Sequence, residues 1–255
     1  MSQTPQRIVC LSAEAADWLW RIGAWDCVAG ITAFFKVPPD AAPKPHVSGF
    51  STAHFEEVAG LKPDLIITFS DVQAPLAAEL MRRGFPVLGT NQRTLLETEA
   101  TLALLGRIVG REAEAERWLC EFRRGLAPVE KVEFRPRVYF EEWNDPLISG
   151  IAWVSELIER AGGDDLFVEL RSKKAALERV VSPEQVCRGN PEVIFASWCG
   201  RPVQTAEMAS RAGWHGLAAV REHRMYEIPG EDILQPGFRL VHGYERMKHH
   251  LGTGR

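Results

Sequence analysis

The sequence predicts an α/β fold of two lobes, each built around a parallel sheet. Short apolar runs alternate with amphipathic helical stretches in both halves of the 255 residues, a pattern typical of parallel sheets. A long helical stretch without strand signal separates the halves, and two similar stretches recur about half the chain apart. Such a spacing suits two related lobes rather than a solenoid. We therefore expect an N-terminal lobe over 1–93, one long linking backbone helix over 94–133 and a C-terminal lobe over 134–255.

The first half reads as a Rossmann-like lobe in which short apolar runs form buried parallel strands. Helical spacing covers 13–25 and a Pro-rich loop covers 34–45. A short acidic helix over 54–62 ends at Pro63, and a later helix ends at Gly84. The predicted strands are 7–12, 28–32, 65–70 and 85–90.

From Thr94 onward, apolar residues recur at helical intervals up to about Val132, with Gly110 punctuating the stretch. This stretch predicts the helix that joins the lobes. The alternation then resumes as a second Rossmann-like lobe. Its predicted strands are 137–143, 193–198 and 224–230, and its predicted helices are 153–163, 213–223 and 238–251.

The two recurring stretches are FEEVAGLKPDLIITFS (55–70) and SPEQVCRGNPEVIFASW (182–198). Each reads as a short acidic helix, then Pro followed by an acidic residue, then a strand. The alternative is that two ordinary loops both use Pro. Two similar lobes create a cleft, and ligands of open α/β sheets bind outside the carboxyl ends of the strands. Those ends are rich in aromatic residues, which predicts a large, flat, partly apolar ligand with a few polar contacts.

Composition and missing motifs exclude several classes of function. The net charge is −4 with interspersed signs, so there is no basic surface for nucleic acid. The five cysteines are scattered without C-x-x-C spacing, which argues against a disulfide framework or a zinc site. No export signal and no run near ~18 apolar residues is found, so the chain as given is expected to be cytoplasmic, and we expect a monomer. G-x-S-x-G, P-loop and G-x-G-x-x-G motifs are absent.

The stretch EEWNDPLISG (141–150) ends a predicted strand with charged and aromatic residues. Glu141 and Glu142 are neighbours on a strand, so they point to opposite faces and do not form a catalytic pair. Trp143 offers a flat ring for stacking, and Asp145 offers a polar partner for a ligand. The alternative is that Asp145-Pro146 is only a turn.

Three stretches resemble a known family: RIVCLSAEAADWLWRIGAWDCVAGIT, LKPDLII and DPLISGIAWVSELIERAGGDDLF. They are similar to the helical-backbone substrate-binding proteins of bacterial ABC importers, which serve vitamin B12, siderophores and haem. Residues 141–163 resemble the vitamin B12 (cobalamin) binders in particular, and the resemblance covers almost the whole chain. It implies a non-enzymatic protein without intrinsic cofactor that binds a corrinoid between its lobes. Members of this family are normally periplasmic or lipid-anchored outside the cell.

The resemblance also implies contact residues. Aromatic contacts of the B12 binders fall on Phe34 and Phe50, both Phe rather than Tyr or Trp. Leu147 stands where one relative has an aromatic residue, and nearby tryptophans are expected to compensate. The full set of expected ligand-binding residues is Phe34, Phe35, Phe50, Trp143, Asp145, Trp153, Trp198 and Gln235.

Family members dock to the importer permease through one surface acid per lobe. Glu56 matches the first of these acids. Leu234 occupies the second position, with Glu231 close by as the expected substitute. Two alternatives stay open: binding of haem or a ferric siderophore by the same fold, and a cytosolic enzyme that uses the same cleft.

Overall fold

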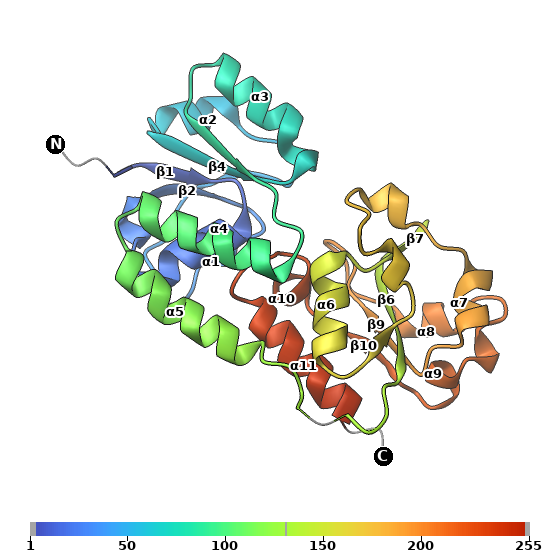
Figure 1. The fold of residues 1–255 in the computed structure, drawn as a ribbon. Helices are drawn as coiled ribbons and strands as arrows, with labels where there is room; N and C mark the ends of the chain where they lie inside the picture. Colours follow the sequence, from blue (N-terminus) through green and yellow to red (C-terminus); the bar gives the residue numbers. More distant parts are fainter. Residues whose placement is uncertain (1–3, 131, 253–255) are drawn as a thin grey trace. The chain divides into compact units, whose positions relative to one another are not determined.

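The computed structural model describes residues 4–130 and 132–252, which divide into two compact units (Figure 1). The first unit runs to Gln92 and resumes over Leu96–Phe122, and the second comprises Arg93–Leu95 and the chain from Arg123 onward. Each unit holds one five-stranded sheet with helices on both faces, so the predicted α/β fold of two lobes is confirmed. Across the described ranges, none of the helices has the length and apolar character needed to cross a membrane.

The first sheet is parallel throughout, with strand order β3-β2-β1-β4-β5. Its strands are β1 (Ile8–Cys10), β2 (Val28–Thr32), β3 (His46–Ser48), β4 (Leu65–Phe69) and β5 (Val87–Thr90). Its helices are α1 (Ala13–Arg21), α2 (Phe55–Gly60) and α3 (Ala74–Arg82). The four strands predicted from apolar runs are confirmed, and β3 is an addition at the end of the Pro-rich loop.

Alternation along β1 and β4 divides the first core into two layers. Val9 and Ile66 pack with Val58 of α2 and Leu80 of α3. On the other face, the buried Trp18 of α1 donates its indole N–H to the carbonyl of Leu102 at 2.8 Å, in helix α4 (Leu95–Ile108). Both faces of the sheet are therefore covered, which explains why its strands read as continuous apolar runs.

The predicted single linking helix is wrong, because the structure has two helices there, α4 (Leu95–Ile108) and α5 (Glu112–Gly125). Gly110 between them has φ 68°, a left-handed conformation that ends the first helix. The two helices pack closely: a Cβ added to Gly106 would lie 2.4 Å from the Cβ of Ala115. The periodicity of apolar residues continues across the break, so it could not reveal the turn.

The second sheet has strand order β10-β9-β6-β7, with β8 also paired to β6. Its strands are β6 (Arg137–Asn144), β7 (Leu147–Ser149), β8 (Asp164–Asp165), β9 (Val193–Ala196) and β10 (Met225–Glu227). β7 runs antiparallel to β6, which corrects the expectation of a purely parallel sheet. The chain makes a tight hairpin after β6 because Asn144 pairs with Leu147.

Helices cover both faces of the second sheet (Figure 1). They are α6 (Ala152–Arg160), α7 (Pro183–Gly189), α8 (Thr205–Ala209), α9 (Ala218–Arg221), α10 (Gly230–Ile233) and α11 (Leu240–Gly252). The helix expected over 213–223 is shorter than predicted, a 3-10 turn followed by α9. Tyr139 and Ile194 pack with Val186 and Met208 on one face.

The internal repeat is present in the structure. Each repeat helix ends on a left-handed residue, Lys62 (φ 49°) or Asn190 (φ 42°), directly before the Pro. The acid after that Pro accepts the backbone N–H of the arginine that precedes the first strand of its unit. In the first unit Asp64 accepts from the N–H of Arg7 at 2.9 Å, and in the second unit Glu192 accepts from the N–H of Arg137 at 2.9 Å. Shared backbone geometry and shared hydrogen bonds favour a repeat over two unrelated loops.

Gly106→Val should lower the midpoint of thermal unfolding, because the added side chain would force α4 and α5 apart where Ala115 packs. Overpacking of this kind costs about 1–3 kcal/mol. Gly60→Val is the matched control, since a Cβ at Gly60 meets no atom within 4 Å. Equal midpoints for the two variants would contradict the close contact of α4 with α5.

Candidate functional site

The carboxyl edge of the first sheet is the expected place for a ligand, because the strand order reverses beside β1. The chain passes from β1 to β2 and β3 on one side, then to β4 and β5 on the other. Open α/β sheets bind ligands outside the strand ends at such a point. Ser12 follows β1 there and Ser70 follows β4. Ser70 has φ 67° and ψ 162°, a conformation almost confined to glycine that clusters at binding sites.

The buried amide of Gln73 joins three segments of this edge. Its oxygen accepts the N–H of Phe69 at 2.9 Å. Its nitrogen donates to the carbonyls of Leu11 at 3.0 Å and Phe50 at 2.6 Å. Because both N–H groups and the oxygen are used, the side chain has one orientation. The ends of β1 and β4 and the loop that carries Phe50 are therefore tied together.

Phe34 and Phe50 lie against each other at this edge, with ring centroids 6.1 Å apart and an interplanar angle of 83°. Both rings are exposed, by 40% and 43%. Thr32 supports them, since its hydroxyl accepts the N–H of Phe34 at 3.4 Å and lies 3.4 Å from the carbonyl of Ser48. Two adjacent aromatic rings left in water are typical of an interaction surface. The structure thus brings together the two aromatic residues that the resemblance indicated.

Polar atoms at the start of α1 are buried without partners. The Ser12 hydroxyl does not cap the helix, and neither it nor Glu14 Oε1 makes a hydrogen bond of ordinary length and angle, although the two side chains are neighbours. Burial raises the pKa of Glu14 to about 7, although its own N–H and the neighbouring Ser12 partly offset the effect. Buried polar groups are nearly always satisfied, so exceptions indicate strain, water or a ligand.

The carboxyl edge of the second sheet holds a buried ion pair. Glu141 is fully buried at 0% exposure, and its carboxylate accepts from both terminal nitrogens of Arg211, at 2.5 and 2.9 Å. The Trp198 indole donates to it at 3.1 Å and the Tyr139 hydroxyl at 3.3 Å. Burial, with the Glu141 charge, raises the pKa of Tyr139 well above its ordinary value. With four donors, this carboxylate is satisfied by the protein itself.

A second ion pair lies on the opposite face of β6, between Glu142 and Arg179. The buried Arg179 donates at 2.7 and 3.1 Å to the two oxygens of Glu142 and also to the carbonyl of Ser149. Glu141 and Glu142 thus serve different arginines, which confirms that they are not a joint acid pair. Nearby, burial and then the Glu142 charge raise the pKa of Cys199.

Three of the aromatic residues expected to contact a ligand are buried and packed within their own units. Phe35 packs against Trp25, with ring centroids 5.8 Å apart. Trp153 donates its indole N–H to the carbonyl of Ile233 at 2.8 Å. Trp198 belongs to the core of the second unit. The sequence places these rings beside strand ends, but their side chains fill the interior.

The remaining expected contacts lie at the surface of the second unit. Trp143 is half-buried and donates to the carbonyl of Asp145 at 2.9 Å. Asp145 and Pro146 are exposed turn residues of the β6–β7 hairpin, so the turn interpretation describes their backbone. Gln235 is half-buried after α10.

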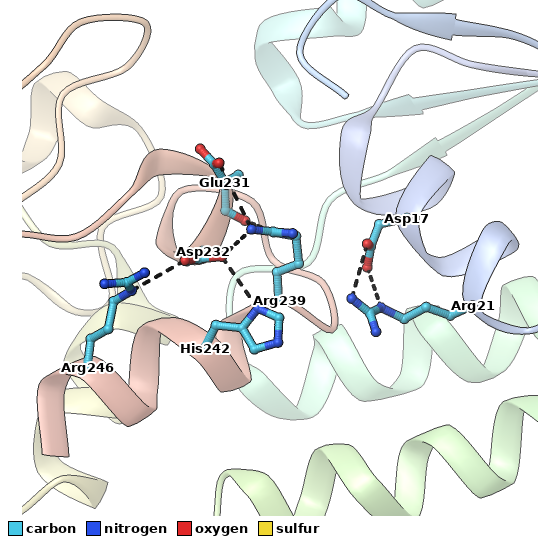
Figure 2. A network of polar contacts seen from close by, with 7 residues as sticks. All are labelled: Asp17, Arg21, Glu231, Asp232, Arg239, His242 and Arg246. Atoms are coloured by element: carbon cyan, nitrogen blue, oxygen red, sulfur yellow. Dashed lines mark hydrogen bonds and ion pairs between the residues drawn. The ribbon is translucent and has the colours of Figure 1, made fainter. Parts of the chain in front are cut away.

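The expected docking acids differ in their surroundings. Glu56 on α2 is 94% exposed and lies 3.7 Å from Arg83. Glu231 on α10 is 36% exposed and lies 4.0 Å from Arg239. Figure 2 shows that Arg239 also contacts the buried Asp232, at 2.6 Å.

Asp232 is the centre of this group in the second unit (Figure 2). Besides Arg239, its carboxylate lies 3.6 Å from His242 and 3.5 Å from Arg246. Burial by itself would raise the pKa of Asp232, but His242 and Arg239 outweigh burial and hold it below its ordinary value. The ionised Asp232 fixes the arginine that faces Glu231.

No cluster of three His, Cys, Asp or Glu side chains suited to a metal ion occurs in 4–130 and 132–252.

Sequence reasoning missed Glu14, Gln73, Arg179 and Arg211. Glu14 stands two residues after the predicted end of the first strand, but an acid in the first turn of a helix is ordinary and gives no distinguishing signal. Arg179 lies in a short 3-10 helix and Arg211 in the bend after α8, both far along the chain from their glutamates, so no local pattern indicated them.

Glu141→Gln should lower the free energy of unfolding by about 3 kcal/mol, because it leaves the Arg211 charge without a carboxylate. Glu245→Gln is the control, since Glu245 makes an exposed pair with Lys248, and such pairs contribute about 0–1 kcal/mol. Urea unfolding measures both. A loss for Glu141→Gln as small as that of the control would contradict the structural role of the buried pair.

The sequence profile of the periplasmic binding protein family matches residues 8–231. A "Cobalamin-binding protein" of Halobacterium salinarum is 27% identical over 97% of this chain and 69% of its own length. A "Vitamin B12-binding protein" of Vibrio cholerae is 25% identical over 95% of this chain and 87% of its own length. The "Uncharacterized ABC transporter substrate-binding lipoprotein YvrC" of Bacillus subtilis is 23% identical over 97% and 80%.

Solved structures share the fold over nearly the whole chain. The "Periplasmic heme-binding protein RhuT from Roseiflexus sp. RS-1" has a TM-score of 0.81 at 18% identity, covering 96% of this chain and 97% of that one. The "periplasmic Vitamin B12 binding protein BtuF of Vibrio cholerae" has a TM-score of 0.72 at 23% identity, covering 97% of each. The family match spans both units, and the chain belongs to the periplasmic binding protein family.

Proposed function

We propose that this protein binds cobalamin or a related corrinoid and delivers it to an ABC importer. The observation that carries the proposal is the exposed Phe34–Phe50 pair at the switch point of the first sheet. A flat macrocycle covers both rings at once and gains about 25 cal/mol for each Å² of apolar surface removed from water. Gln73 holds the Phe50 loop in place before the ligand arrives, which lowers the ordering cost of binding.

The family supports this proposal over the enzyme alternative. The chain is a substrate-binding protein, and its relatives are named for binding or transport rather than for catalysis. Those relatives are named for cobalamin and vitamin B12. The haem-binding neighbours share the fold at lower sequence identity, so they support the fold alone. The corrinoid is the transported ligand, and binding needs no intrinsic cofactor.

The second unit supplies further contacts. We assign ligand contact to Trp143, whose ring is half-buried and fixed through its indole N–H. The exposed Asp145 and the half-buried Gln235 are polar side chains that suit the amide groups of a corrinoid. The buried Trp153 and Trp198 shape their surroundings without contacting the ligand.

Delivery to an importer would use one exposed acid from each unit. Glu56 is the more available of the two, since its single ion pair is long and exposed. Glu231 faces Arg239, which Asp232 already neutralises in part. The Glu231 side chain is 36% exposed, so a basic surface on a permease could reach it.

Phe34→Ala and Phe50→Ala should each weaken binding of cyanocobalamin about tenfold, the effect of losing about 1.4 kcal/mol. Phe134→Ala is the control, because Phe134 is also exposed but precedes β6, at the amino end of its strand. Absorbance titration of the corrin measures the three dissociation constants. Wild-type affinity in both Phe34→Ala and Phe50→Ala would remove this site assignment.

Glu56→Ala and Glu231→Ala should reduce corrinoid uptake by proteoliposomes that carry the importer of the same organism. Binding of the corrinoid itself should not change, because both acids act on the permease. Glu57→Ala is the control, since Glu57 is the exposed neighbour of Glu56 on α2. Full uptake with the double variant would show that docking uses other residues.

A further inference from the structure

Two buried glutamates, one at the end of β6 and one in the first turn of α1, differ in their hydrogen bonds. Glu141 at the end of β6 receives four hydrogen bonds from protein groups. Glu14, 6% exposed just beyond the end of β1, has an oxygen that receives none. A buried acceptor without a partner costs about 1–3 kcal/mol. The fold therefore satisfies the Glu141 carboxylate completely, whereas it leaves one oxygen of Glu14 without a hydrogen bond.

The location of Glu14 points to the ligand. Gln73 donates to the carbonyl of Leu11 and to that of Phe50, so the residues that open α1 begin where the Phe50 loop is attached. They also follow the central strand at the switch point of the sheet. Glu14 therefore stands in the first turn of α1, at the same carboxyl edge of the first sheet that carries the exposed aromatic pair, and this edge is where the fold class binds ligands.

The adjacent Ser12 determines the chemistry of a suitable ligand group. Its buried hydroxyl lacks a partner as well, and a hydroxyl can donate, while an ionised carboxylate can only accept. An anion would be repelled by Glu14. A primary carboxamide satisfies both groups, because its N–H can donate to Glu14 while its carbonyl accepts from Ser12.

We propose that Ser12 and Glu14 form a subsite for a peripheral carboxamide of the ligand. This inference rests on the proposed function, since corrinoids carry carboxamides around the macrocycle. It also gives a reason for selectivity, because haem carries carboxylates at its periphery and would place a negative charge against Glu14. The aromatic pair accepts either macrocycle, and the subsite favours the amidated one.

The test compares cyanocobalamin with its three monocarboxylic acids, each of which has one peripheral propionamide hydrolysed. Calorimetric titrations at about pH 8 keep Glu14 ionised. The wild type should bind at least one isomer about tenfold or more weakly than cyanocobalamin, and Glu14→Gln should largely abolish that difference. Glu57→Gln, on the exposed face of α2, should keep it. Equal binding of all four corrinoids by the wild type would overturn the subsite and leave the corrinoid function standing.

The midpoint of thermal unfolding, measured without ligand, tests the Ser12–Glu14 subsite separately from the corrinoid function. Glu14→Gln should raise the unfolding midpoint at about pH 8, whereas Glu141→Gln lowers it. Between the ordinary pKa of 4.5 and the folded pKa of about 7, the unfolded chain ionises before the folded protein does. Wild-type stability therefore falls as pH rises through this window, and Glu14→Gln should remove that fall. Burial, and then the Glu14 charge, raise the pKa of Cys10 well above its ordinary value, so Cys10 stays protonated through this window.

The binding and unfolding results together distinguish failure of the corrinoid function from failure of the Ser12–Glu14 subsite. If the wild type binds none of the four corrinoids and Glu14→Gln is stabilising, the corrinoid function fails while the subsite stands for another carboxamide ligand. If Glu14→Gln lowers the midpoint as Glu141→Gln does, Glu14 is a structural carboxylate. The subsite is then overturned, whatever the ligand.

Discussion

The register of two central strand pairs is the constraint on which both units depend. Asp64 accepts the N–H of Arg7, just before β1, and donates its own N–H to the Arg7 carbonyl at 3.0 Å. In the second unit, Glu192 makes the same two bonds: its carboxylate accepts the N–H of Arg137, and its own N–H donates to the Arg137 carbonyl. A slip by one residue would turn every side chain of a strand to the other face. These bonds therefore determine which residues reach the carboxyl edge, including Ser12 and Ser70 in the first unit.

Hydrogen bonding separates the polar groups that hold the fold from those that are available to a ligand. Glu141 is buried with Arg211 as its partner, and the buried Arg179 pairs with Glu142. Removing one member of such a pair lowers the stability of the fold, because it leaves the other charge unpaired. Gln73 uses both of its side-chain N–H groups and its oxygen in hydrogen bonds to the backbone. In the first unit, Gln73 thus gives rigid support to the ligand edge. Ser12 and Glu14, at the same edge, each leave an oxygen without a hydrogen bond, as polar groups at binding sites commonly do.

Much of the fold could be predicted because local patterns determine it. Seven strands of the structure coincide with apolar runs, and the Pro-acid repeat marks the same turn in both units. The turn at Gly110 was missed because apolar spacing continues through it. The strand after Pro146 was also missed, since it follows β6 directly in a tight hairpin and Asp145-Pro146 reads as the turn that ends the earlier strand.

The candidate site could be predicted only in part. Phe34 and Phe50 came from the resemblance, and the structure places their rings together. Burial of Trp153 and Trp198 depends on packing between distant segments, which no local pattern records. Glu14 drew no notice because the sequence reads as an acid in the first turn of a helix, which is ordinary. Only its missing partner distinguishes it.

The most direct test of the account is a competition titration of the purified protein with cyanocobalamin, cobinamide and hemin, followed by corrin absorbance and Trp fluorescence. The account predicts saturable binding of a corrinoid that hemin does not displace at equal concentration, because the aromatic pair accepts a macrocycle and the polar edge selects carboxamides. Binding of hemin without binding of either corrinoid would contradict it.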